Sequence, residues 1–185
     1  MTSAPRLTVL LPGALLVALL LMLAGPTAGA SAACKAADKP AYSVSSKTAR
    51  KATLCLINKQ RAKHGVKKLK EDGGQRKAAK KHTRRMLKKG CFSHVCPGEG
   101  DLVSRVNATS YLPCNCSWGL GENIAYGFGS QSSPKLIVKA WMKSSGHRAN
   151  ILNRSFEHIG IGIKPGVPTS GGHGATYTTT FGYRD

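Results

Sequence analysis

Acidic residues are scarce in this chain, which has 8 Asp and Glu against 28 Lys and Arg in 185 residues. The imbalance is concentrated between Lys35 and Lys89, where 19 basic residues face three acids. A surface so rich in one sign of charge attracts anionic surfaces, so we expect anionic envelope polymers or lipids as partners. The alternative is that the charge serves solubility and gives only weak, salt-sensitive attraction. Nucleic acid is not expected as a physiological partner.

Long apolar runs are also few, and the one from Leu7 to Ala24 is broken by a Pro and a Gly. Arg6 precedes it, and the small residues 30–32 follow it. This order is typical of a secretory signal peptide over residues 1–32, so we expect a secreted mature chain without a transmembrane segment. The alternatives are a retained anchor, for which the run is barely long enough, and lipidation at Cys34, whose flanking motif is poor.

Free thiols are not expected, because an even number of cysteines in an exported chain predicts disulfides. All six follow the apolar run: Cys34, Cys55, Cys91, Cys96, Cys114 and Cys116. Pairing Cys34 with Cys55 would join an N-terminal arm to the first helix. The other four form two clusters. We expect two bridges between these clusters, because pairing within Cys114-Asn115-Cys116 would be strained. A four-cysteine zinc site is the alternative, and the spacings fit it badly.

Periodicity predicts an α+β domain over residues 47–185, preceded by an extended arm over residues 33–46. Apolar residues at helical spacing and glycine or proline at the ends predict helices, over 47–64, 75–89, 101–107, 134–143 and 148–152. Strands are expected over 124–126, 158–163 and 175–181. In residues 158–163 isoleucine alternates with glycine. Glycine on one face of a strand indicates that another element packs very close to that face.

Three polar segments carry the candidate chemistry: Cys91–His94, Gly121–Ile124 and Trp141–Leu152. Each places His94, Glu122 or His147 beside Gly or Ser and close to large apolar residues. An apolar frame can hold such side chains rigidly. Neutral imidazoles are metal ligands, and a carboxylate can orient a bound water, so the three segments can begin a divalent metal site.

The three segments, in this order, resemble the CAP superfamily of cysteine-rich secretory proteins, antigen 5 and pathogenesis-related proteins, and are most similar to its bacterial branch. The resemblance runs from about Thr53 to Gly182 and includes the closing segment 177–182, Tyr-Thr-Thr-Thr-Phe-Gly. It implies a three-layer α-β-α sandwich with a central cleft. In the animal and plant branches, two His and two Glu meet in that cleft.

Only part of that set is present here. His94 stands where the first family His follows a small residue and an aromatic, and Glu122 matches the Glu of the Gly-Glu-Asn segment. The position of the other Glu is Ser144, and the place of the second His, at the start of the last strand, is Thr176. His147 belongs to the bacterial Gly-His-Arg segment and stands in for that His. A mechanism that needs two carboxylates is therefore in doubt.

We therefore expect a secreted binding protein whose cleft is built on His94, Glu122, Ser144 and His147. Its ligand would be a lipid or an envelope component, and His94 and His147 would hold Zn²⁺ or another divalent cation. A metal-free polar cluster is the alternative for the two histidines. For Glu122, the alternative is a structural carboxylate that accepts backbone amides and fixes the loop. The alternative functions are a metal-dependent hydrolase with Glu122 as general base, and a polycationic envelope adhesin without a working cleft.

Three nearby residues are assigned to structure instead. His82 lies on the apolar stripe of the second helix and is interpreted as a core histidine. Trp141 is interpreted as a core residue, and Asn150 as a residue that caps or bridges the backbone locally.

Overall fold

The computed structural model describes Met1 and residues 33–112, 115–169 and 172–185, and residues 33–185 form one compact unit. The expected signal peptide, apart from Met1, and Cys114 lie outside the described residues. No helix in the described part of the chain is long and apolar enough to cross a membrane.

Four strands form a single mixed sheet in the order β1-β3-β4-β2. Their bounds are β1 Lys70–Glu71, β2 Trp118–Phe128, β3 His158–Pro165 and β4 Gly174–Arg184. The long strand β4 pairs antiparallel with both β2 and β3, whereas β1 pairs parallel with only the first two residues of β3. Among the described residues, β2 is therefore one edge of the sheet, and β3 is left without a partner on its outer side beyond Ile159.

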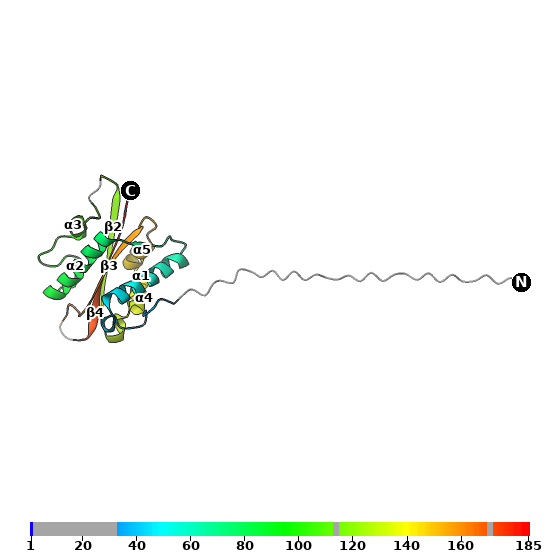
Figure 1. Ribbon diagram of the computed structural model, residues 1–185, viewed down its shortest axis with the longest axis horizontal. Helices are drawn as coiled ribbons and strands as arrows, with labels where there is room; N and C mark the ends of the chain where they lie inside the picture. The colour runs from blue at the N-terminus through cyan, green and yellow to red at the C-terminus, as the bar shows by residue number, and fades with distance from the viewer. Residues whose placement is uncertain (2–32, 113–114, 170–171) are drawn as a thin grey trace. The chain divides into compact units, whose positions relative to one another are not determined.

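Helices cover both faces of this sheet, which gives three layers (Figure 1). One face carries α1 Ser46–Lys63, α4 Pro134–Lys143 and α5 Ser145–Leu152. The other face carries α2 Gly73–Lys89 and the short α3 Leu102–Asn107. The 3-10 turns η1 Ala41–Ser43 and η2 Gly129–Ser132 precede α1 and α4. The expected α+β, three-layer α-β-α sandwich is confirmed.

The alternation in β3 separates the two helical layers. Ile159, Ile161 and Ile163 are buried in the core that α1, α4 and α5 share with the sheet. The glycines face α2, and a Cβ at Gly160 would lie 2.1 Å from the backbone carbon of Gln75. Glycine is therefore required there because the α2 backbone lies directly on the strand, and the predicted close packing is confirmed.

Helix ends follow the local sequence. The Ser45 side chain accepts a hydrogen bond from the Thr48 amide at the start of α1, and the Asp72 side chain caps α2 in the same way. Gly90 ends α2 in the left-handed conformation, with φ of 58°. Such caps satisfy backbone groups that a helix leaves without partners, so the expected boundaries of these two helices are nearly correct.

A fully buried arginine joins α1 to the segment between α5 and β3. The Arg61 guanidinium donates to the carbonyl oxygens of Lys67, Ile151, Asn153 and Phe156, at 2.6 to 2.9 Å. Burial lowers the pKa of Arg61. These bonds fix the end of α5, and α5 carries part of the candidate site.

Two sequence predictions need correction. The strand expected over 124–126 is the 11-residue β2, because its whole length pairs with β4. Cys34 pairs with Cys55 as expected, but Cys91 pairs with Cys96 inside the first cluster. The turn after α2 brings their Cα atoms to 5.9 Å, within the range that a disulfide spans. Cys116 is also disulfide-bonded.

Candidate functional site: a cleft at the outer edge of β2

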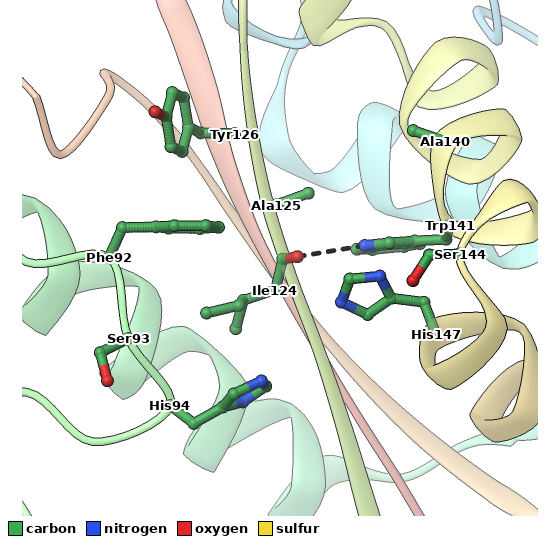
Figure 2. Close-up of a pocket in the computed structure, with 10 residues that line it drawn as sticks. All are labelled: Phe92, Ser93, His94, Ile124, Ala125, Tyr126, Ala140, Trp141, Ser144 and His147. Atoms are coloured by element: carbon green, nitrogen blue, oxygen red, sulfur yellow. Dashed lines mark hydrogen bonds between the residues drawn. The ribbon is translucent and has the colours of Figure 1, made fainter.

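A cleft of about 610 Å³ lies along β2, the edge strand of the sheet. The loop after α2 forms one wall, α4 and α5 form the other, and β2 lies between them (Figure 2). The lining is mostly apolar, and apart from Tyr126 four of its residues carry a hydroxyl or an imidazole group. The full lining is Phe92, Ser93, His94, Ile124, Ala125, Tyr126, Ala140, Trp141, Ser144 and His147. The structure therefore brings His94, Ser144 and His147 into one lining.

Glu122 lies behind this lining as a buried carboxylate. Its side chain is 2% exposed and projects from β2. Arg105 of α3 donates from Nη2 to Oε2 at 2.6 Å, and His94 donates from Nδ1 to Oε1 at 2.8 Å. The His94 side chain is 56% exposed, so Glu122 holds the inner nitrogen of an imidazole whose other nitrogen is free to face the cleft.

Arg105 is the residue of this site that sequence reasoning missed. Its Nη1 also donates to the carbonyl oxygens of His94 and Gly100, at 2.8 and 2.9 Å. One guanidinium thus positions both the backbone of His94 and the carboxylate that orients its ring. The sequence offered no signal for it, because a single Arg on a short helix has no distinctive spacing.

A second buried pair lies behind Glu122. His82 of α2 is fully buried, as predicted, and donates from Nδ1 to Glu99 Oε1 at 2.7 Å. Burial lowers the pKa of His82, and the positive charge of Arg105 lowers it further. These two effects outweigh the carboxylates of Glu122 and Glu99, which raise the pKa. His82 Nε2 is 3.9 Å from Glu122 Oε1. His82 therefore supports the inner side of the site and does not line the cleft.

The opposite wall carries Ser144 and His147. Helix α4 ends at Lys143 and α5 begins at Ser145, so His147 lies inside the first turn of α5, not in the break expected between the helices. Burial lowers the pKa of His147, and the nearby His94 lowers it further. Thr176, at the family position of the second His, donates to the Gly166 carbonyl oxygen and does not line the cleft.

Two asparagines join the motif segments. Asn150 Nδ2 donates to the Glu122 carbonyl oxygen at 3.1 Å and to Asn123 Oδ1 at 2.9 Å. Asn123 Nδ2 in turn donates to the His147 carbonyl oxygen at 3.0 Å. Asn150 thus links α5 to β2, far away in the sequence, whereas the sequence predicts that it caps or bridges the backbone locally. The link sets where His147 lies relative to Glu122.

Residues 54–181 match the model of the CAP family, described as the cysteine-rich secretory protein family. This chain belongs to the CAP family. It is 40% identical over 109 residues to the uncharacterized protein YkwD of Bacillus subtilis, covering 58% of this chain and 39% of that protein. It is 34% identical over 116 residues to the uncharacterized membrane protein YlbC of the same organism, covering 63% and 32%. The chain thus spans about two fifths or less of the length of these relatives.

Solved structures share the CAP fold. An extracellular protein of Bacillus anthracis that contains an SCP domain superposes with a TM-score of 0.56 at 24% identity, covering 75% of this chain and 43% of that one. An outer surface protein of Borrelia burgdorferi superposes with a TM-score of 0.60 at 20% identity, covering 77% and 97%. Extracellular or surface proteins thus use this fold.

The donor set of the CAP cleft falls short of a zinc centre. A carboxylate behind the inner nitrogen of His94 is the usual arrangement around a metal-binding imidazole. However, the described residues contain no group of three or more His, Cys, Asp or Glu that could hold a metal ion. Glu122 is engaged by Arg105 and His94, which leaves His94 and His147 as the only candidate ligands in the lining. A catalytic zinc normally has three protein ligands, so this set does not fit one.

The cleft opens beside a row of aromatic rings. Phe92 and Tyr126 meet edge to face with centroids 4.8 Å apart, and Tyr126 meets Phe128 at 5.8 Å. Phe92 and Phe128 are 44% and 43% exposed. On the inner side, Trp141 is buried as predicted and donates from Nε1 to the Ile124 carbonyl oxygen, as the dashed line in Figure 2 shows. Trp141 also forms part of the lining, so it is both a core residue and a wall of the cleft.

Proposed function

We propose that this CAP domain works outside the cell and binds an amphipathic ligand, a lipid or lipid-like envelope component, in the cleft beside β2. The extracellular setting is supported by the solved CAP relatives, which include an extracellular protein and an outer surface protein. The ligand class is supported by the lining: apolar walls, an aromatic mouth, and a few polar groups from His94, Ser144 and His147. Such a combination is typical of small-molecule sites, where apolar area gives affinity and polar groups fix orientation.

The observation that carries this proposal is the state of Glu122. Both of its oxygens accept hydrogen bonds, one from Arg105 and one from His94, and the side chain is nearly inaccessible. A general base needs to reach the proton that it removes, directly or through one water. Glu122 is instead a positioning residue for His94, and the contacts favour a binding cleft over a hydrolase.

The test fills the cleft without disturbing the core. Ala140 is exposed on α4 and lines the cleft, so Ala140→Trp places an indole in it. Ala62, exposed on α1 and outside the cleft lining, provides the matched control Ala62→Trp. The probe is a zwitterionic dansyl-lysophosphatidylcholine below its micelle concentration, followed by fluorescence. We expect saturable binding to the native domain and to Ala62→Trp, and loss of binding in Ala140→Trp. Equal binding by the two variants, or none by the native domain, would refute the proposal.

A further inference from the structure

A second hollow lies along the outer side of β3, toward the edge of the sheet opposite β2. It has a volume of about 310 Å³. Ser46 and two cations from α1, two cations from α2 and two residues of β3 line it: Ser46, Lys47, Arg50, Arg76, Lys80, Ile161 and Ile163. The strand order puts β3 and β2 on opposite sides of β4, so this hollow is separate from the cleft.

The charge around this hollow is strongly unbalanced. Glu71 supplies a carboxylate: Arg50 Nη1 donates to its Oε1, and Arg76 Nη1 lies 3.8 Å from the same oxygen. Lys47 and Lys80 are exposed, and neither has an acidic partner within 4.0 Å among the described residues. Four cations therefore face one carboxylate, and that carboxylate also fixes the direction of the Arg50 side chain.

Strand β3 lies at the base of the hollow. The Ile159 carbonyl oxygen accepts from the Asp72 amide on the outer side of β3, so Ile159 directs its backbone polar groups away from β4. Polar groups of a strand alternate in direction with a period of two residues, so Ile161 and Ile163 direct theirs to the same side. Strand β1 ends at Glu71, opposite Ile159. Within the described residues, Ile161 and Ile163 thus have no strand partner on this side, and at 0% and 4% exposed they close the base of the hollow beneath the four cations.

We propose that this hollow binds a phosphate group, as the monoester or diester of an anionic envelope component. Guanidinium and ammonium groups approach from α1 and α2, on either side of the buried strand. A tetrahedral oxyanion accepts hydrogen bonds from several directions at once, and Arg and Lys are the residues that bind it best. The first turn of α1 adds the positive end of an 18-residue helix on the same side. The site does not depend on the function proposed for the cleft.

The experiment compares two pairs of cations on the same helix. Arg76→Gln with Lys80→Gln removes two cations that line the hollow. Lys77→Gln with Lys81→Gln removes two exposed cations of α2 that do not line it, at the same spacing. Both double variants have the same net charge, so general polycationic attraction would fall equally in both. The whole domain is titrated with sn-glycerol 3-phosphate by calorimetry, and with phosphatidylglycerol vesicles by co-sedimentation.

We expect binding to weaken about tenfold or more in the first double variant and to change by less than about twofold in the second, because a hydrogen bond to a charged group is worth more than about 1.4 kcal/mol. Binding to the soluble phosphate identifies a free or polymeric phosphate as the source, and binding to vesicles alone identifies a lipid headgroup; both support the site. Equal weakening in the two double variants would overturn it, as would the absence of binding to both probes.

Discussion

The close approach of α2 to β3 makes a sharp prediction for Gly160→Ala. The new Cβ would lie 2.1 Å from the Gln75 backbone carbon and 2.3 Å from the Arg76 amide nitrogen. Carbon atoms in ordinary contact are about 3.5–4.0 Å apart. The helix backbone must therefore move by more than an ångström, because no flexible side chain is there to give way.

Overpacking of this kind costs about 1–3 kcal/mol, and a clash with backbone belongs at the upper end. For a domain of this size, each kcal/mol lowers Tm by about 2–4 °C, so we expect Gly160→Ala to lower Tm by about 6–12 °C. The measurement is thermal unfolding of the oxidised domain, followed by circular dichroism and calorimetry.

Two other glycines serve as controls. A methyl group added at Gly146 in α5 would have nothing within 4 Å, and this glycine has no positive φ, so Gly146→Ala should be neutral or stabilising by up to about 1 kcal/mol. Gly65 also has open space but a φ of +64°, so Gly65→Ala should cost about 1 kcal/mol through backbone strain alone. If Gly160→Ala had the same Tm as the native domain, the reasoning about the α2–β3 contact would be refuted.

Three further predictions concern the site. Arg105→Met leaves the Glu122 carboxylate buried without its guanidinium, so the free energy of unfolding in urea should fall by about 3–5 kcal/mol, and a loss below about 1 kcal/mol would contradict the ion pair. Because the pKa values of His82 and His147 are lowered in the folded state, the unfolded chain takes up protons first as pH falls below about 6.5, and stability should decline from there toward the lowered pKa values. His82→Gln should flatten that decline in unfolding measured between about pH 7 and 5, and an unchanged slope would exclude His82 as its source. Zn²⁺ uptake by His94 and His147 stays a prediction, which calorimetry can check: uptake should be weak and lost in the double Ala variant, and uptake unchanged in that variant would exclude this pair.

The sequence predicts those features of this fold that depend on neighbours along the chain. The helices α1 and α2 follow from apolar spacing and from Ser45, Asp72 and Gly90 at their ends. The tight packing on β3 follows from its Ile-Gly alternation, because a bare strand face indicates a close partner even when the partner is unknown. The family motifs also name His94, Ser144 and His147, which lie in one lining, and their role as a site stays a prediction.

Features that depend on distant partners were missed. The Arg105–Glu122 pair joins α3 to β2, and neither residue has a sequence neighbour that indicates the other. Asn150 reaches Asn123 across 27 positions, so it reads as a local cap until the fold is known. The Cys91–Cys96 bridge depends on the direction that the chain takes after Gly90. An even number of cysteines predicts that they form disulfides, but it does not predict which cysteines pair.

Among the described residues, no strand pairs with the outer side of β3 beyond Ile159, and this has a consequence for self-association. Unpaired amides and carbonyls at the edge of a sheet are a template on which the strand of another molecule can form. A second copy of this chain that approached β3 in this way would bring its own Lys47, Arg50, Arg76 and Lys80 against the same four cations. The two sets of cations would repel each other. Salt weakens this repulsion, because it shortens the Debye length to about 8 Å at roughly 0.15 M. The basic residues beside β3 should therefore keep copies of the domain apart, and a polyanion that neutralises them should allow the copies to pair along this strand.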